Sequence, residues 1–524
     1  MITTDIRLPY KYIESDVKDA ICARLPVLRD EVGQIRLLKR TLVIDESKPF
    51  YKCTVAFSAY GKEEKLLKLK KHVRSCPTLE WSIPLVKMSS RPVVVGAGPA
   101  GLFCALALAE AGCAPIVLER GMKVEDRSKR VAAFHALGVL DPECNVQFGE
   151  GGAGTYSDGK LKFGSMDKYK LKVLEEFIKN GADSEVAFSS TAHLGTDKLK
   201  SIIPAIRNKI ISLGGEFRFS SRLDEIIMRD GRVSKVVYHS EGERISIDTS
   251  DLVLATGHSA RDTFAMLYKM GIPMTAKGFG IGVRIEYPRE YINGIVNRDC
   301  AHIVEETASY HLVTHLSNGR SVYSFCMCPG GSVVAAASSC GGIVTNGMSE
   351  YDRMAANSNA ALLVSFTPAD FPDSSPLSGF ALQKSIEDKA YSLTDSYKAP
   401  VSNLSHLLEG KNPSCIRGVA PSYPLGTECF SLRSYLPEVV GASIAAAIAD
   451  FDAYLPGYSY SDAVLTGPET RTTSPVRISR NDGYEAVGFG GVYPAGEGSG
   501  YSGGIVSSAV DGLRVAEAIL LKYS

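Results

Sequence analysis

The chain has 524 residues, 45% of them hydrophobic and 22% charged, and this size predicts two to four packed domains. Lysine plus arginine and aspartate plus glutamate each number 58, so the formal net charge is zero. This balance argues against a general nucleic-acid-binding protein and a membrane-surface protein. The start of the chain lacks a signal-peptide core, no apolar run could span a bilayer, and the 12 cysteines have no framework spacing. We therefore expect a soluble, cytoplasmic protein with reduced cysteines.

Residues 1–88 are expected to form a small, separate α+β module. A strand at 6–10 precedes a helix from Glu14, two strand-like runs follow, and a basic helix is expected at 62–74. This order is typical of a ferredoxin-like fold. The lysine-rich helix could offer RNA or an acidic partner a surface, although interleaved leucines are more typical of a solvated amphipathic face.

The strongest functional signal begins after an apolar strand, in the sequence VVVGAGPAGLFCALALAEAG. Gly96, Gly98 and Gly101 have the spacing G-x-G-x-x-G and open an alanine-rich helix at 100–111, and the next strand ends in Glu119. In dinucleotide-binding folds these glycines allow a tight turn, close approach of the pyrophosphate and close helix packing, while the acid accepts hydrogen bonds from ribose. The helix amino end would face the phosphates.

The rest of the chain predicts a nucleotide-binding domain that is split in sequence. Glycine-rich α/β patterns occupy 89–275, including helices near 171–180 and 197–213 and a hairpin at Asp230–Gly231. A different texture, with few dinucleotide features, occupies 276–469, and glycine-rich α/β returns at 470–524. We therefore expect an α/β fold, with a Rossmann-like domain in two parts and an inserted α+β cap domain between them.

The closing segment, GVYPAGEGSGYSGGIVSSAVDG, indicates which dinucleotide is bound. It reads as a strand at 492–494, a glycine loop with Glu497, and a helix from Gly504. This segment resembles the end of FAD-binding domains of the glutathione-reductase type, in which the last helix aims its amino end at the flavin ring. The acid in that pattern is more often aspartate. The resemblance implies FAD, rather than NAD, as the ligand of the first fingerprint.

Long, unusual strings carry a wider resemblance. They are QFGEGGAGTYSDGKL at 147–161, LATGHSARDTFAMLY at 254–268, FCMCPGG at 325–331, IVTNGMS at 343–349 and ETRTTSPVRI at 469–478. Over essentially its whole length, the chain resembles a bacterial family of FAD-dependent dehydrogenases that are mostly uncharacterised oxidoreductases. The resemblance implies a dehydrogenase or reductase that transfers hydride between bound FAD and an unidentified small molecule.

The expected cofactor-binding residues lie in the fingerprint loop, after the second strand, in the 147–161 loop, at the Ala-Thr-Gly strand end and in the closing loop. They are Gly96, Gly98, Pro99, Ala100, Gly101, Glu119, Arg120, Arg127, Gly151, Gly152, Ala153, Gly154, Thr155, Ser157, Thr256, Gly257, Gly496, Glu497, Gly503, Gly504 and Ile505. Arg127 could reach the pyrophosphate or could be an ordinary surface arginine. Lys160 belongs to the same glycine-rich loop.

Candidate catalytic residues follow the strand that ends in Ala-Thr-Gly and continue into the cap. His258 is a candidate proton donor, because an unperturbed imidazole titrates near neutrality, and Arg261 follows it. Arg284 and Arg471 are candidates to hold an anionic substrate or a negatively charged reduced flavin, with surface salt bridges as the alternative. Asn346 is also expected to contribute to specificity.

Cys326 and Cys328, one residue apart, could exchange electrons with the flavin as a thiol–disulfide oxidoreductase does. Flavin disulfide reductases usually carry C-x₄-C on the first long helix or C-x-x-C elsewhere, and neither spacing occurs here. Structural or substrate-lining cysteines are the favoured alternative. No cluster has convincing zinc spacing, so no metal is expected.

The sequence gives weaker signals for the electron donor and for the partners than for the cofactor. The nearest second fingerprint, at 278–284, lacks the spacing and the helix, so NAD(P)H is a candidate only as a transient donor. A small-molecule substrate is expected, nucleic acid and membrane are not, and no feature specifies an oligomeric state. A further alternative is an RNA- or protein-binding factor that keeps FAD as a structural or sensing ligand.

Overall fold

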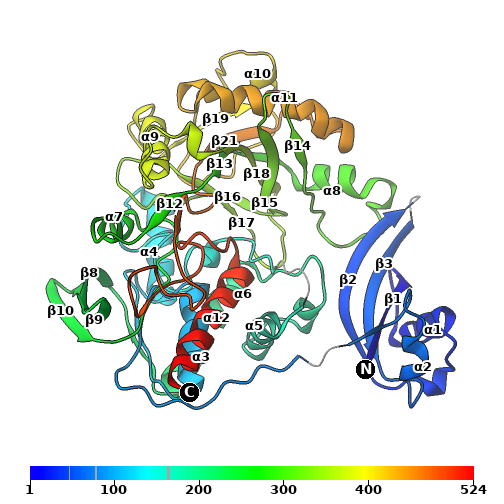
Figure 1. Ribbon diagram of the computed structural model, residues 1–524. Helices are drawn as coiled ribbons and strands as arrows, with labels where there is room; N and C mark the ends of the chain where they lie inside the picture. The colour runs from blue at the N-terminus through cyan, green and yellow to red at the C-terminus, as the bar shows by residue number, and fades with distance from the viewer. Residues whose placement is uncertain (46–47, 77–78, 162–165) are drawn as a thin grey trace.

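The computed structural model describes residues 1–45, 48–76, 79–161 and 166–524 (Figure 1). Its first unit is a four-stranded antiparallel sheet with the order β2-β3-β1-β4. The elements are β1 (Ile2–Pro9), α1 (Glu14–Arg24), β2 (Ile35–Asp45), β3 (Lys48–Phe57), α2 (Glu63–Leu67) and β4 (Arg74–Ser75). This order and pairing are those of the split β-α-β arrangement, so the ferredoxin-like prediction is confirmed.

The predicted basic helix at 62–74 is wrong in its extent. Helix α2 ends at Leu67, and the chain turns before β4. Within α2 only Leu66 is buried. The following run, Lys-Leu-Lys-Lys, places like charges close together and has little apolar surface to bury, so a longer helix gains no packing.

The dinucleotide-binding half is built on a five-stranded parallel sheet with the order β23-β11-β5-β6-β7. Its strands are β5 (Val93–Val95), β6 (Ile116–Leu118), β7 (Glu216–Arg218), β11 (Leu252–Leu254) and β23 (Val492–Pro494). All are short apolar or mixed runs, and the central ones are fully buried, as parallel strands covered on both faces must be. Strand β23 pairs with β11 although it lies far away in sequence, so the sheet is completed by the end of the chain.

Helices cover this sheet. They are α3 (Pro99–Glu110), α4 (Val124–Leu137), α5 (Lys168–Lys179), α6 (Gly195–Ser212) and α12 (Ile505–Tyr523). Figure 1 shows α3 and α12 lying side by side, and both contribute to one core cluster that includes Leu106 and Leu513. The helices predicted near 171–180 and 197–213 are α5 and α6, each starting slightly earlier than expected.

A smaller antiparallel sheet and one helix lie beside the parallel sheet. They are β8 (Ser221–Arg229), β9 (Arg232–Ser240), β10 (Glu243–Asp248) and α7 (Arg261–Lys269). Strands β8 and β9 form the predicted hairpin. It turns at Asp230 and Gly231, which both have positive φ, the conformation that two-residue hairpin turns require.

The third unit is a seven-stranded sheet with the order β14-β15-β18-β13-β21-β19-β20 (Figure 1, top). Its strands are β13 (Phe279–Pro288), β14 (Val313–His315), β15 (Ser321–Cys328), β18 (Asn357–Phe366), β19 (Ala399–Asn403), β20 (Thr427–Cys429) and β21 (Val464–Glu469). Its helices are α8 (Arg289–Asn297), α9 (Ser378–Ser392), α10 (Leu404–Leu408) and α11 (Glu438–Tyr454). The apolar face of α11 packs on this sheet through Ile444 and Ile448.

Two short ladders connect the units. They are β12 (Met274–Ala276) with β22 (Val476–Ile478), and β16 (Ser332–Ala335) with β17 (Thr345–Met348). The first joins the chain just before and just after the seven-stranded sheet. The predicted fold class is therefore confirmed, with a Rossmann-like sheet split in sequence around a second sheet. The domain boundaries after 88, 275 and 469 stay a prediction.

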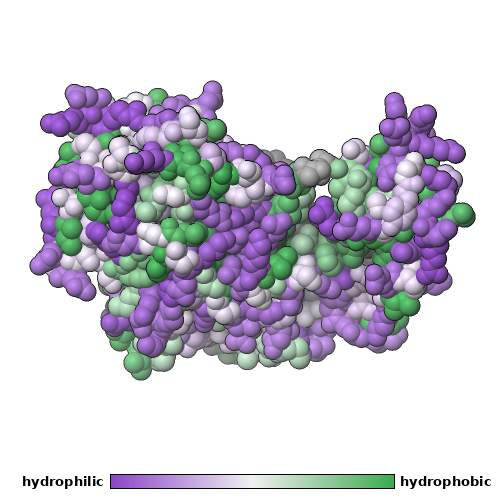
Figure 2. Space-filling view, turned by 90° about the horizontal axis from the view of Figure 1, so that it is seen from below, coloured by the Kyte–Doolittle hydropathy of each residue, from purple (hydrophilic) through white to green (hydrophobic). Residues whose placement is uncertain are grey.

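Figure 2 shows a largely hydrophilic face with scattered apolar patches rather than one continuous apolar area. Across the part of the chain that the structure describes, no helix is both long and apolar enough to cross a membrane.

Candidate functional site

A cavity of about 370 Å³ lies where the parallel sheet meets the seven-stranded sheet. Its lining comes from the ends of β5, β11 and β23, the starts of α3 and α12, the 147–160 loop, and one side of the seven-stranded sheet. Ligands of open α/β sheets bind at the carboxyl ends of the strands, and the volume is typical of a small-molecule site.

The fingerprint loop forms one wall through Gly96, Gly98, Pro99 and Ala100. Gly96 has φ 102°, and a Cβ there would lie 2.3 Å from the carbonyl oxygen of Ala255. Helix α3 starts at Pro99 with no side-chain cap, which leaves its first free N–H groups without a side-chain partner.

Gly101 does not line the cavity, in contrast to the prediction that it contacts the cofactor. A Cβ at Gly101 would lie 1.8 Å from the carbonyl oxygen of Gly96. The residue therefore acts through packing, by letting α3 lie against the loop that follows β5.

Glu119 lies at the end of β6 and lines the cavity. Its Oε2 accepts the Ala97 N–H at 2.8 Å, and its Oε1 accepts the N–H groups of Gly121 and Gly149 at 2.9 and 3.0 Å. The carboxylate thus ties the fingerprint loop to the next glycine-rich loop. Arg120 also lines the cavity, and its guanidinium pairs with Glu143 and Asp262.

Arg127 does not line the cavity, so the expectation that it reaches the pyrophosphate is wrong. The side chain is fully buried, and its guanidinium donates to the backbone carbonyls of Asn145, Val146, Gly149, Glu150 and Gly152. A buried cation that finds this many acceptors on one loop holds the loop in shape. Arg127 therefore positions the 145–152 segment from behind.

The 147–160 loop lines the cavity with Gly152, Ala153, Gly154, Ser157 and Lys160. Part of it forms the short 3-10 helix η2 (Ala153–Tyr156).

Gly151 and Thr155 of this loop do not line the cavity, contrary to prediction. A Cβ at Gly151, where φ is 85°, would lie 2.1 Å from Thr155 Oγ1. Both residues shape the loop turn rather than contact a ligand.

The closing segment forms the opposite wall with Gly496, Glu497, Gly503, Gly504 and Ile505. Helix α12 begins at Ile505 without a side-chain cap, so the partial positive charge of its amino end is directed at the cavity. A Cβ at Gly503 would meet no atom within 4 Å. The absence of a side chain at Gly503 therefore leaves open space beside this wall, which a larger residue would fill.

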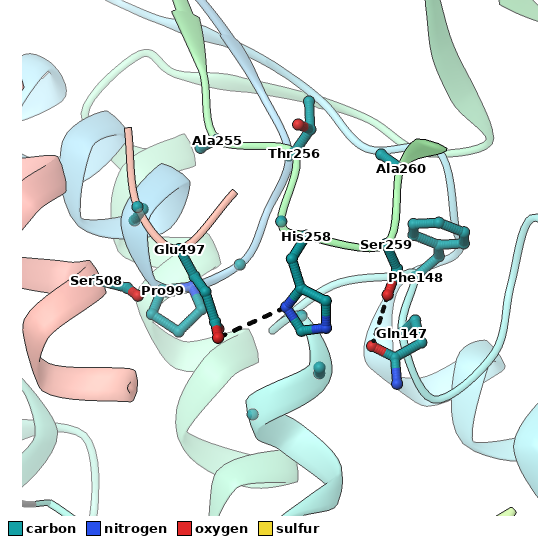
Figure 3. Close-up of a pocket in the computed structure, with 18 of the residues that line it drawn as sticks. Pro99, Gln147, Phe148, Ala255, Thr256, His258, Ser259, Ala260, Glu497 and Ser508 are labelled. Atoms are coloured by element: carbon teal, nitrogen blue, oxygen red, sulfur yellow. Dashed lines mark hydrogen bonds and ion pairs between the residues drawn. The ribbon is translucent and has the colours of Figure 1, made fainter. Parts of the chain in front are cut away.

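Thr256, Gly257 and His258 all line the cavity, and Figure 3 shows the His258 ring lying beside Glu497. Its Nδ1 lies 3.6 Å from Glu497 Oε1, and the ring is 9% exposed. Its Nε2 is buried and has no hydrogen-bond partner among the described residues. A buried imidazole nitrogen of this kind is available to a bound ligand.

Arg261 does not line the cavity, and its predicted catalytic contact is wrong. Its guanidinium pairs with Glu387 at 2.9 and 3.0 Å, and Gln383 accepts a further bond. Arg471, which does line the cavity, pairs with the same carboxylate at 3.0 and 3.1 Å. Burial alone would raise the pKa of Glu387, but the two arginines lower it to about 2. Two cations therefore share one anion, which leaves a net positive charge at the cavity wall.

Arg284 also stays out of the cavity, so its predicted contact with an anion is wrong. It is fully buried, and its donors are used by Glu469, Cys326 O, Asn346 Oδ1 and Asn359 Oδ1. Arg284 therefore forms its ion pair with Glu469, a buried carboxylate at the end of β21.

Glu469 lines the cavity beside Asn346. Burial raises the pKa of Glu469 to about 7, against the opposing charge of Arg284. This side of the cavity therefore carries a buried carboxyl group that is held by Arg284.

The two cysteines are placed differently. Cys326 lines the cavity, whereas Cys328 is buried behind it and does not. Of the two cysteines, only Cys326 is therefore placed to line a substrate site, and the candidate exchange of electrons between the pair and the flavin stays a prediction.

Several lining residues were not predicted. They are Leu118, Gln147, Phe148, Gly149, Asp158, Gly159, Ser221, Arg222, Leu223, Ser259, Ala260, Thr263, Phe325, Glu469, Thr472, Val506, Ser507 and Ser508. Many belong to the long strings at 147–161, 254–268 and 469–478, so taking whole strings, rather than selected letters, would have found them. Three of them, Ser221, Arg222 and Leu223, belong to β8, which lies in a hairpin that carries no functional motif.

The geometry fits FAD. The fingerprint loop, two uncapped helix amino ends, the open position at Gly503 and the unpartnered His258 Nε2 surround one cavity. Within the described ranges, no three His, Cys, Asp or Glu side chains gather as a metal site would require.

Comparison with known proteins places the chain in a family. A family model described as "FAD-dependent protein, C-terminal domain-like" matches residues 278–472. An uncharacterised protein of Clostridium beijerinckii is 43% identical over 517 residues, which are 96% of this chain and 95% of that protein. The chain therefore belongs to this family of FAD-dependent proteins.

Solved flavoprotein structures are more distant. A flavin-dependent brominase is 12% identical, with 83% of this chain and 79% of that chain covered and a TM-score of 0.40. Aklavinone-11 hydroxylase, solved with FAD and aklavinone, is 14% identical, with 83% and 63% covered and a TM-score of 0.38. A geranylgeranyl bacteriochlorophyll reductase-like protein from Thermoplasma acidophilum is 10% identical, with 83% and 79% covered and a TM-score of 0.37.

Proposed function

We propose that this protein is an FAD-dependent dehydrogenase or reductase that transfers hydride between bound FAD and a small molecule. The observation that carries the proposal is one continuous cavity with a glycine-built dinucleotide wall and a facing wall of charged and polar side chains. When bound, FAD supplies the two-electron chemistry, and the protein supplies position and electrostatics.

The residues that would hold the cofactor are mostly backbone. Pro99 has no N–H, but the free N–H of Ala100 in the first turn of α3 suits the pyrophosphate, and Glu119 suits a ribose hydroxyl. Gly504 and Ile505 at the start of α12 offer N–H groups and a positive dipole end to a part of the cofactor that gains negative charge, while the Gly503 N–H donates to Ser507 Oγ at 3.3 Å.

His258 is the proposed proton donor. Its Nε2 faces the cavity without a protein partner, and Glu497 on the Nδ1 side can orient the ring. The net positive charge of Arg261, Glu387 and Arg471, with Arg471 facing the cavity, favours a substrate that carries an anionic group. Asn346 and Lys160 extend the same wall.

The seven-stranded sheet would act as a cap over the cofactor and set specificity. We include the boundaries after 88, 275 and 469 in this proposal, because strands of that sheet lie between Phe279 and Glu469 while β23 returns to the parallel sheet. Exclusion of water by such a cap would protect hydride from loss to solvent.

NAD(P)H is the proposed transient donor, and anaerobic mixing tests it. The purified flavoprotein is mixed with NADPH, and separately with NADH, while the visible flavin bands are followed. Bleaching by either nucleotide supports the proposal and identifies the donor. Flavin bands that dithionite bleaches but neither nucleotide bleaches would remove NAD(P)H from the proposal.

A further inference from the structure

Cys326 and Cys328 lie close together in the cap-side wall of the cavity, at a bulge in β15. The pairing of β15 with β18 shifts register between Phe325 and Cys328, and Cys326 has φ 41°. Positive φ is uncommon for a residue with a side chain, and bulges re-aim side chains near functional sites. The bulge presents Cys326 to the cavity and leaves Cys328 behind it.

The two thiols are neighbours on the bulge, separated by one residue. The Cys328 thiol donates to the Cys326 carbonyl oxygen, with its Sγ 3.3 Å from that oxygen. Both cysteines are free thiols in the structure. Two neighbouring free thiols, one of which lines a cavity, have the arrangement of an attacking and a resolving cysteine.

The surroundings make the two sulfurs unequal. Arg284 donates to the Cys326 carbonyl oxygen at 2.8 Å, and Lys160 Nζ donates to the carbonyl of the intervening Met327. Asp158 and Glu469 are the acidic groups on this side, and each is already paired, with Arg353 and Arg284 respectively. The sulfurs therefore lie near Lys160 and near Arg284, whose charge is partly offset by its ion pair with Glu469.

The titration of the pair follows from these contacts. The neighbouring Cys328 thiol, helped by Arg284 and Lys160 against the effect of burial, lowers the pKa of Cys326 to about 6. The neighbouring Cys326 and burial raise the pKa of Cys328 well above its usual range. At neutral pH one sulfur is then the thiolate nucleophile, and its neighbour keeps a proton.

We propose that Cys326 and Cys328 form a dithiol–disulfide couple that reacts with a small disulfide in the cavity. The Cys326 thiolate attacks one sulfur of the disulfide, forming a mixed disulfide and expelling one thiolate. Cys328 then loses its proton and attacks Cys326 Sγ, which closes the internal disulfide and expels the second thiolate. One small disulfide is reduced to two thiols, and the cysteine pair is oxidised by two electrons.

The small ring of a C-x-C disulfide suits this role. Strained disulfides have more oxidising potentials and are the labile or catalytic ones, so the couple can be reduced again. The couple shares the cavity with the proposed FAD site, and reduced flavin is the proposed reductant. This last link rests on the proposed function, and it deepens that function by naming a disulfide as the substrate class.

The test uses the purified holoprotein, made fully reduced and freed of reductant, with hydroxyethyl disulfide as the probe under anaerobic conditions. After the reaction, thiols are alkylated in denaturant and the peptides are mapped by mass spectrometry. The expected product has two thiols fewer than the 12 of the sequence and an internal disulfide between Cys326 and Cys328.

Two variants divide the reaction into its steps. Cys328→Ser should trap the probe as a mixed disulfide on Cys326, whereas Cys326→Ser should leave Cys328 unmodified. Cys340→Ser, which removes an exposed cysteine on the same segment, is the control and should behave like the wild type. Flavin content and the thermal midpoint show that each variant folds. Wild-type protein that forms no internal disulfide, or a Cys328→Ser variant that traps no probe, would overturn the couple.

A second readout separates this couple from the flavin chemistry. Dithionite-free photoreduction of the flavin in the oxidised protein should restore two thiols as the flavin band returns. A flavin that is reduced while the disulfide persists overturns the link between them and leaves the proposed oxidoreductase intact. Protein that binds no flavin but still forms the disulfide overturns the proposed function and leaves the couple intact.

Discussion

The two walls of the cavity are built in different ways. The dinucleotide wall is made of backbone, with glycines at Gly96, Gly98 and Gly503 and helix starts at Pro99 and Ile505. The cap wall is made of charged side chains that other buried charges hold. Arg471 rests on Glu387, which also binds Arg261, and Glu469 rests on Arg284. A cofactor common to a family can be held by a fixed backbone, whereas side chains on the other wall are free to define a substrate.

We first expect that the fingerprint loop, at Gly96 and at Gly101 behind it, tolerates almost no added volume. Gly101→Ala places a Cβ 1.8 Å from the Gly96 carbonyl oxygen, so α3 must move away from β5. We expect loss of bound flavin and of most soluble folded protein, measured by the absorbance ratio of flavin to protein and by yield. Gly294→Ala in α8, where a Cβ meets nothing within 4 Å, is the control and should retain full flavin content. A flavin-replete Gly101→Ala protein would contradict this account.

On the cap wall, the largest loss is expected when the shared anion is removed. Glu387→Gln leaves the buried Arg471 and the partly buried Arg261 without a carboxylate, and breaking a buried ion pair in this way costs about 3 to 5 kcal/mol. Denaturant unfolding measures the change. Asp388→Asn, which alters a neighbouring exposed carboxylate paired with Lys384, should cost far less. Equal losses of unfolding free energy from the two variants would show that the cluster of Arg261, Glu387 and Arg471 stabilises the fold no more than an exposed ion pair does.

The lowered pKa of Glu387 predicts how the unfolding free energy depends on pH. The pKa of Glu387 is lowered from 4.5 to about 2 in the folded protein, so its stabilising contribution is full above pH 4.5 and is lost as pH falls toward 2. The difference in unfolding free energy between wild type and Glu387→Gln should therefore be constant at neutral pH and shrink below pH 4.5. A difference that grows on acidification would contradict the charge assignment.

His258 lies where the two walls meet, and we expect it to affect the rate of flavin reduction rather than the binding of flavin. His258→Gln removes the imidazole that faces the cavity and should slow flavin reduction by the active donor by roughly 100-fold, within the usual range for a positioned proton donor. Flavin content should not change. His302→Gln, at an exposed position, is the control. An unchanged rate in stopped-flow mixing would remove His258 from the chemistry.

Exposed ion pairs outside the cavity are expected to have the smallest effect on stability and on flavin reduction. Lys11 and Glu305 join the first sheet to the chain after α8, with side chains 72% and 75% exposed. Lys11→Ala should leave the thermal midpoint and flavin reduction unchanged, since exposed pairs are solvated and screened. Tyr51→Phe, which removes a half-buried hydrogen bond to Glu306, should lower the midpoint measurably. A larger effect from Lys11→Ala than from Tyr51→Phe would contradict this ranking.

The first wall could be predicted from sequence because its signals are local. The glycine spacing, the adjacent apolar strand and Glu119 lie within one β-α-β unit, and each has a single structural reason. The return of the chain at β23 was also predictable from its own strand, loop and helix pattern. The basic segment after Leu67 was not, because helix length there depends on buried surface that residues 68–71 lack.

The second wall could not be predicted because its partners are far apart in the chain. Arg284 and Glu469 are separated by 185 positions, and Arg261 and Glu387 by 126. An arginine in a sequence does not show whether its charge meets a ligand, a buried carboxylate or, as for Arg127, a set of carbonyls. Long-range packing decides between these outcomes, so only the structure separates Arg471, which lines the cavity, from Arg127, Arg261 and Arg284, which do not.

Whether the cavity holds FAD is decided by the identity and amount of flavin released from the purified protein. The protein is denatured, the supernatant is analysed by absorbance and mass spectrometry, and the amount of flavin is compared with the protein concentration. We expect close to one FAD per chain, retained through gel filtration. Protein that carries no flavin and binds none when FAD is added, or that carries only a mononucleotide, would contradict this expectation.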